Sequence, residues 1–160
     1  MRVFYDLEFG DTEREISLVS IGAAREDGRE YYAVSSEFDP MAVHPSVRAN
    51  VLPQLPPAAQ WRPRAQIRDE LLEFLGPDPV LWAWYGAYDH VALCQLWGSM
   101  TALPRVMPRY TRELKQYWEE HGSPALPPVP DDSHDALADA RHNLAKFRAI
   151  EAARAWSDRT

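Results

Sequence analysis

Hydrophobic and β-branched residues gather in three segments near the start of the chain. Residues 2–9, 16–25 and 29–38 are rich in Val, Ile, Phe and Tyr, which favour extended strands. The sequence Glu-Asp-Gly at residues 26–28 supplies a tight turn between the second and third segments. These segments are therefore predicted to form an antiparallel meander of three strands.

The rest of the chain alternates between helical and strand-like patterns. Apolar residues occupy every fourth position from Ile67 to Leu75, which predicts a helix over residues 64–75. A proline-rich stretch over residues 39–63 is predicted to be a long surface loop with one short helix. The other predicted elements are a buried strand over 80–85, a helix over 89–97, a short strand near 105–107, a helix over 111–120, and a final helix from Ser133, its cap, to Trp156.

This order predicts an α/β protein with a mixed sheet flanked by helices. An antiparallel meander followed by an α-β-α-β-α run is the arrangement of ribonuclease H-like folds. With 160 residues, 46% of them hydrophobic, the chain fits a single domain over residues 1–160. The first residues lack a signal-peptide pattern, and the longest nearly uncharged run, residues 80–88, is too short to span a bilayer. We therefore expect a soluble cytoplasmic protein.

Charge and cysteine content exclude some function classes. A formal net charge of −7 argues against a protein that coats duplexes by broad phosphate neutralisation. It leaves a nuclease open, because bound divalent cations can supply positive charge at the scissile phosphate. Cys94 is the only cysteine, which excludes an internal disulfide and a cysteine-based zinc site within one chain.

Two carboxylates, Asp6 and Glu8, stand two residues apart in the first predicted strand. Their side chains therefore project from the same face of the strand and repel each other. Either a solvated strand edge or a divalent cation bound through oxygen relieves this repulsion. The apolar residues on both sides of the pair favour the cation, because unpaired carboxylates well inside a sheet are unfavourable.

Three further residues complete a candidate site. Asp89 follows a predicted strand and opens a helix, a frequent site position in open α/β sheets, although aspartate is also a common helix cap. His134 precedes Asp139 by five residues, about 500° around a helix, so the two do not share a helical face. We place His134 in the loop before the last helix, where it can act as a base on water at a metal that Asp139 holds. A solvated histidine near a helix start is the alternative.

The motifs Asp6-x-Glu8, Asp89 and His134-x4-Asp139, in this order, resemble those of the DEDDh family of 3′→5′ exonucleases, and the resemblance spans nearly the whole chain. More narrowly, residues 6–9, 81–97 and 134–141 look like the polyadenylate-specific exoribonuclease family called RNase AS. The short connection over residues 76–79 departs from that family, where a longer loop is expected. The departure concerns loop geometry and leaves the metal-binding motifs intact.

The resemblance implies a site for two Mg²⁺ ions, with Mn²⁺ able to substitute. Its metal ligands would be Asp6, Glu8, Asp89 and Asp139, and His134 would take the proton of the attacking water. It also implies trimming of single-stranded RNA from the 3′ end, a preference for adenylate, release of nucleoside 5′-monophosphates, and a homodimer. A DNA proofreading exonuclease and a catalytically silent RNA-binding module on the same fold remain alternatives.

The sequence also offers candidates for substrate binding. An aromatic residue directly after Glu8 could stack on a terminal base for about 1–3 kcal/mol, with core packing as the alternative. A basic cluster over residues 105–115 could contact phosphates, although most such clusters are solvated surface. The candidate substrate-binding residues are Phe9, Trp84, Arg105, Arg109 and Arg112.

Overall fold

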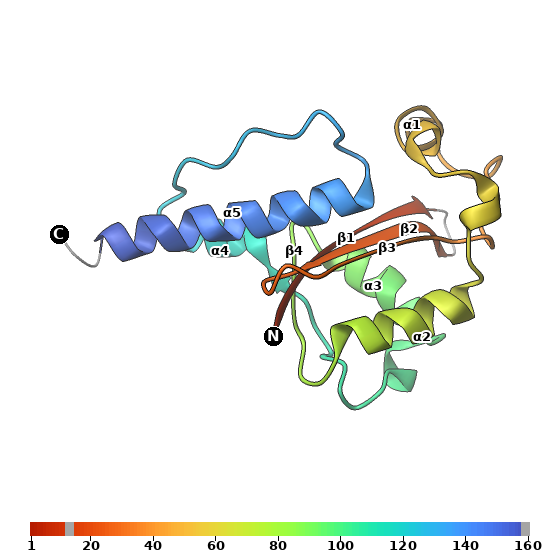
Figure 1. The fold of residues 1–160 in the computed structure, drawn as a ribbon, viewed down its shortest axis with the longest axis horizontal. Coiled ribbons are helices and arrows are strands. Elements are labelled where there is room, and N and C mark those ends of the chain that lie inside the picture. Colours follow the sequence, from red (N-terminus) through yellow and green to blue (C-terminus); the bar gives the residue numbers. More distant parts are fainter. Residues whose placement is uncertain (12–14, 158–160) are drawn as a thin grey trace.

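A computed structural model of the protein describes residues 1–11 and 15–157. These residues form a mixed five-stranded sheet in the order β3-β2-β1-β4-β5, with helices on both faces (Figure 1). The strands are β1 (Arg2–Asp11), β2 (Ile16–Arg25), β3 (Glu30–Val34), β4 (Val80–Ala83) and β5 (Arg112–Glu113). β1, β2 and β3 pair antiparallel, whereas β4 runs parallel to β1 and β5 parallel to β4. The predicted meander and mixed α/β architecture are confirmed.

The helices cover the sheet in two layers. In Figure 1, α2 and α3 lie against one face, and α4 and α5 lie against the other. The helices are α1 (Pro45–Asn50), α2 (Arg64–Leu75), α3 (Ala87–Gln95), α4 (Leu114–Glu120) and α5 (Ala136–Ser157), with 3₁₀ turns η1 (Leu52–Gln54), η2 (Ala58–Gln60) and η3 (Met100–Ala102). α2 has the predicted bounds, and α1 is the short helix expected in the proline-rich stretch.

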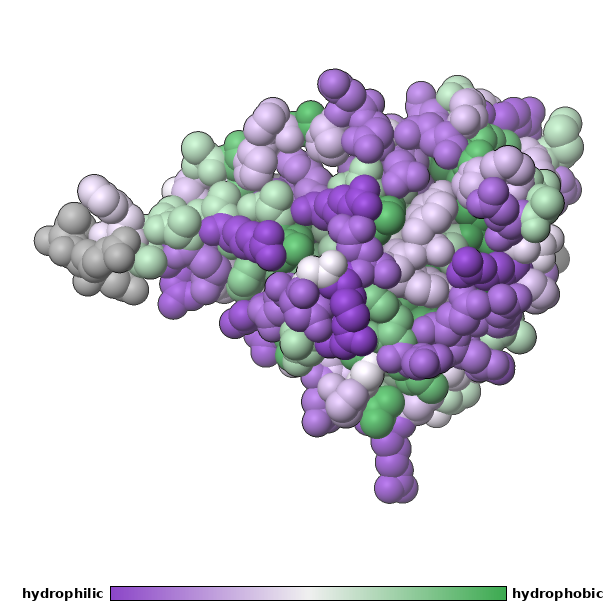
Figure 2. All heavy atoms as spheres, viewed as in Figure 1, coloured by the Kyte–Doolittle hydropathy of each residue, from purple (hydrophilic) through white to green (hydrophobic). Residues whose placement is uncertain are grey.

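The surface of the molecule mixes polar and apolar side chains. Figure 2 shows polar groups over most of the visible face, with apolar groups scattered between them. Even α5, which has 22 residues, carries charged side chains along its length. In the described ranges, no helix is both long and apolar enough to cross a membrane.

Alternation along β1 divides its side chains between the two layers. Tyr5 and Leu7 pack into the core shared with α2 and α3. Phe4 packs on the opposite face, in the core shared with α4 and α5. Asp6 and Glu8 continue the row that begins at Phe4, so both carboxylates face the layer that contains α5.

The prediction of a strand near residues 105–107 is wrong. This segment lies between two prolines and forms turns instead, and Val106 is exposed. The fifth strand is β5, at the start of the segment that was predicted to be helical. Glu113, its last residue, accepts hydrogen bonds from the backbone N–H groups of Tyr85 and Gly86, which fixes β5 beside the end of β4.

The last helix begins at Ala136, three residues later than predicted. Oδ1 of Asp135 accepts hydrogen bonds from the backbone N–H groups of residues 137 and 138, at 3.0 and 2.9 Å. Asp135 therefore caps α5, and the prediction that Ser133 does so is wrong. An aspartate satisfies the free N–H groups of a helix start as well as a serine does, so the sequence alone did not distinguish them.

Candidate active site

Asp6 and Glu8 hold fixed positions because β1 pairs with β2 at both residues. Asp6 is opposite Gly22 of β2, and Glu8 is opposite Ser20. A bulge follows directly, since Phe9 is opposite Leu18 and the register shifts by one residue. The two carboxylates thus lie on the last regular stretch of β1 before the strand bends.

Gly22 allows α5 to start in contact with the sheet. A Cβ atom at this position would lie 2.2 Å from the carbonyl oxygen of Ala136 and 2.3 Å from the nitrogen of Leu137. Any other residue would therefore push the first turn of α5 away from β2. Because Gly22 is the partner of Asp6, the close approach brings the start of α5 to the carboxylates of β1.

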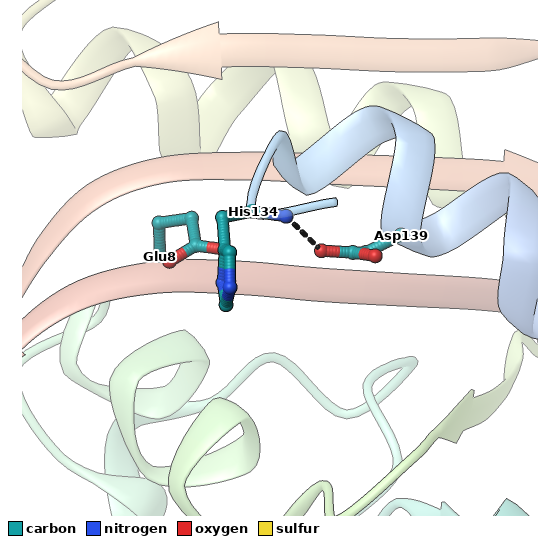
Figure 3. A group of neighbouring side chains, drawn as sticks. All are labelled: Glu8, His134 and Asp139. Carbon is teal, nitrogen blue, oxygen red and sulfur yellow. Dashed lines mark hydrogen bonds between the residues drawn. The ribbon is translucent and has the colours of Figure 1, made fainter. Parts of the chain in front are cut away.

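Glu8, His134 and Asp139 meet at this junction (Figure 3). One ligand atom from each of them lies within 4.8 Å of the others. His134 is exposed in the turn before α5, as predicted, and its backbone has the left-handed φ of 72°. Its N–H donates a 2.8 Å hydrogen bond to Oδ2 of Asp139. The carboxylate of Asp139 thus holds the loop and is also part of the cluster.

Asp89 reaches the site from the other side of β1. β1 pairs with β4 only as far as Phe4, so the N–H of Leu7 has no strand partner there. Oδ1 of Asp89, in the first turn of α3, accepts that N–H at 2.8 Å, and the side chain is 6% exposed. The cap position of α3 is Gly86. The alternative that Asp89 serves as an ordinary helix cap is therefore wrong.

The turn from β4 into α3 is built to present Asp89. Tyr85 has the left-handed φ of 57°, and Glu113 accepts the N–H groups of Tyr85 and Gly86, both at 2.9 Å. A Cβ at Gly86 would lie 2.6 Å from Cβ of Ala83, so the turn requires glycine. The contribution of Glu113 depends on a contact 28 residues away in sequence, and no local pattern indicates it.

Burial and mutual repulsion raise the pKa values of the carboxyl groups. Burial, and then the charge of Asp89 and other carboxylates, raises the pKa of Asp6 well above its usual range. Burial and then the charge of Asp139 raise the pKa of Glu8 to about 8. Burial raises the pKa of Asp89 to about 6. Repelling carboxyl groups of this kind are stabilised as anions when a cation joins them.

The donor set fits a hard divalent cation. Carboxylate oxygens are the ligands that Mg²⁺ prefers, and they dominate this cluster. Glu8, His134 and Asp139 offer ligand atoms at one point. The charges of Asp89, Asp139 and Glu8 all raise the pKa of Asp6, so Asp6 interacts electrostatically with the same carboxylates.

Two of the candidate substrate-binding residues are aromatic and make ring contacts with other elements. Phe9 is half-buried beside the core and stacks with Tyr88, with 6.1 Å between ring centroids and 13° between planes. Tyr88 is 52% exposed, so one ring of this aromatic pair remains accessible from solvent. Trp84 is also half-buried, and Nζ of Lys146 lies 4.3 Å from its ring centroid.

The other three candidates make local contacts. Arg109 donates to the carbonyl oxygens of Met100 and Leu103 and so holds its own loop together. Arg112 lies over the ring of Trp82 at 5.6 Å, and Arg105 is exposed in the segment before β5. In the described part of the chain, no hydrogen bond or ion pair joins these arginines to the carboxylate cluster.

Comparison with known proteins gives concordant matches along the chain. A family described as the 3′-5′ exoribonuclease Rv2179c-like domain matches residues 1–151. Two curated proteins from strains of Mycobacterium tuberculosis, named 3′-5′ exoribonuclease Rv2179c and 3′-5′ exoribonuclease MT2234.1, are each 61% identical to the chain over 156 residues. Each match covers 94% of the chain and 93% of the relative.

Proposed function

Because the chain belongs to the 3′-5′ exoribonuclease Rv2179c-like family, we propose that its carboxylate cluster hydrolyses single-stranded RNA from the 3′ end with the help of divalent cations. The observation that carries this proposal is the meeting of Glu8, His134 and Asp139 within 4.8 Å. Asp6 and Asp89 interact electrostatically with carboxylates of this group, which supports their inclusion in the site. Repelling carboxylates next to a histidine form a site that needs a cation and can accept a proton.

The residues of the chain have separate tasks in this reaction. Asp6, Glu8, Asp89 and Asp139 would hold Mg²⁺, and the family resemblance implies two such ions. When bound, Mg²⁺ supplies positive charge to the scissile phosphate and favours ionisation of water. His134 is exposed and held through its backbone by Asp139, which leaves the imidazole available to take a proton from the attacking water. The expected product is a nucleoside 5′-monophosphate.

The aromatic pair Phe9 and Tyr88 is the proposed platform for the 3′-terminal base. Phe9 directly follows Glu8 along β1, and Tyr88 directly precedes Asp89 in α3. Stacking of a base on an aromatic ring contributes about 1–3 kcal/mol, and a purine offers the larger surface. This arrangement favours a purine at the 3′ end, a class that includes the adenylate that the family resemblance implies.

A homodimer is part of the proposal. The family resemblance implies one, and β5, which has two residues, is an edge strand of the sheet. The exposed arginines at 105 and 112 lie next to and on this edge. In a dimer they could reach RNA bound to the partner subunit.

Hydrolysis of homopolymers labelled at the 5′ end tests the proposal. Oligomers of A, C and U, each as RNA and as DNA, are incubated with Mg²⁺, with Mn²⁺ or with chelator. The expected result is metal-dependent shortening from the 3′ end, fastest for oligoadenylate RNA. Equal rates on the A, C and U oligomers would contradict the adenylate preference, and faster cleavage of DNA would favour a proofreading enzyme. Internal cuts, or no hydrolysis at all, would refute the exonuclease.

A further inference from the structure

Three polar side chains of α5 form a line on the face that packs against the sheet. Asp139, Asn143 and Lys146 are separated by four and three residues, which places them one above the other on a helix. Further along α5, Phe147 and Ile150 are buried in the hydrophobic core. A lysine beside a core requires polar partners, because burial of an unpaired ammonium group is unfavourable.

Asn143 holds Lys146 in place. Asn143 is 2% exposed, and its Nδ2 donates to the carbonyl oxygen of Tyr5 at 3.3 Å, directly before Asp6 in the sequence. Its Oδ1 accepts a hydrogen bond from Nζ of Lys146 at 3.1 Å. The same ammonium group lies 4.3 Å from the ring centroid of Trp84, a favourable cation–π distance. Contacts from α5 and from the segment after β4 therefore fix its position.

The ammonium group of Lys146 is directed at the carboxylate cluster. Side chains on a helix lean toward its N-terminus, so Lys146 points back along α5 toward Asp139. Burial lowers the pKa of Lys146, while the charges of Asp139 and Asp6 act in the opposite direction. In residues 1–11 and 15–157, Lys146 forms no direct ion pair with a carboxylate. Its ammonium group donates to Asn143 and keeps donor capacity for a ligand.

In the occupied site, one negative charge would remain for Lys146 to neutralise. Four carboxylates and two divalent cations would balance each other, and the RNA phosphate would then carry one uncompensated negative charge. We propose that Lys146 binds an RNA phosphate at the active site, held in position by Asn143 and Trp84. The inference rests on the proposed function and adds a substrate-binding residue to it.

Binding of RNA by charge variants tests this assignment. Lys146→Met keeps the length of the side chain and removes the charge, and Lys146→Arg keeps the charge. Arg148→Met is the matched control, since it removes a positive charge from an exposed position two residues along α5. Affinity for a fluorescent oligoadenylate is measured by anisotropy with Mg²⁺ at several salt concentrations. His134→Ala serves as the common background, which is expected to slow cleavage.

Lys146→Met is expected to weaken RNA binding about tenfold, and to lower the slope of log affinity against log salt by about 0.7, the effect of one phosphate contact to a single strand. Lys146→Arg should retain most of the affinity, and Arg148→Met should retain both quantities. Thermal melting establishes that each variant is folded. Unchanged affinity and salt slope in folded Lys146→Met would overturn the inference. If wild-type protein degrades RNA in that case, only the role of Lys146 is refuted and the proposed function stands. If wild-type protein does not degrade RNA, the proposed function is refuted.

Discussion

At the scale of single residues, the site is defined by carboxyl groups that are withdrawn from water. Asp6, Glu8 and Asp89 all have raised pKa values, and burial is the largest cause for each. Placing such groups together lowers the stability of the folded protein in the absence of metal. A bound cation would restore that stability.

The raised pKa of Glu8 should change how the free energy of unfolding depends on pH. The pKa of Glu8 rises from 4.5 to about 8 in the folded protein. Between these values the folded state keeps a proton that the unfolded state has lost, so this group lowers stability as pH increases. In chelator, Glu8→Gln should therefore gain stability relative to wild type from about pH 5 to 8.

Urea unfolding of both proteins at a series of pH values measures this difference. Saturating Mg²⁺ should reverse the advantage of the variant, because wild type binds the cation through Glu8. A difference that stays constant across this pH range would contradict the assignment of Glu8.

His134 should affect the rate and leave the fold intact. Asparagine tolerates the left-handed backbone at this position, so His134→Asn removes the imidazole with little strain. The rate of RNA hydrolysis should fall by about 10²–10⁴-fold, a typical effect of losing a general base. A wild-type rate of hydrolysis in folded His134→Asn would show that His134 is not the base.

At the scale of elements, the site depends on the contact between β2 and the start of α5. A Cβ at Gly22 would lie 2.2 Å from the backbone of Ala136. Gly22→Ala should therefore displace α5, with a loss of about 1–3 kcal/mol of stability and a large loss of activity. Gly10→Ala is the control, since the nearest atom to its Cβ would be Cγ1 of the Val43 side chain, at 3.1 Å. Urea unfolding and hydrolysis assays measure both effects, and full activity in Gly22→Ala would refute this explanation.

Sequence patterns predicted the elements that are defined by local periodicity. The meander and α2 follow from the hydrophobic spacing within each segment, which does not depend on what the segment packs against. The strand expected at residues 105–107 failed because β5 depends on the contacts of Glu113, which lie far away in sequence. The five candidate catalytic residues were placed on the correct elements, because motif and element order are both properties of the sequence.

The supporting residues could not be predicted in this way. Gly22, Glu113 and Asn143 contact groups that are 27 to 138 residues away along the chain, or backbone atoms of another element. Lys146 looks like any helical lysine until its partners are known. Their roles depend on tertiary contacts, which one sequence without the structure does not contain.

At the scale of the whole molecule, an acidic protein must bind an anionic polymer. The net charge of −7 opposes long-range attraction of RNA, so binding has to rely on local cations and stacking. A dimer would bring the exposed arginines near β5 to a second subunit. Light scattering at working concentration should give the mass of two chains, and the mass of a single 18.3 kDa chain would refute the dimer.

The central claim is that the carboxylate cluster binds the metal that hydrolyses RNA, and Asp139→Asn tests it most directly. Asparagine keeps an oxygen that can accept the N–H of His134, so the loop stays in place while the charge is lost. Asp11→Asn, at an exposed position at the end of β1, is the control. Shortening of oligoadenylate labelled at the 5′ end is followed in Mg²⁺. The account predicts a ladder of 3′-shortened products for wild type and the control, and intact RNA for folded Asp139→Asn. Near-normal shortening by that variant would contradict it.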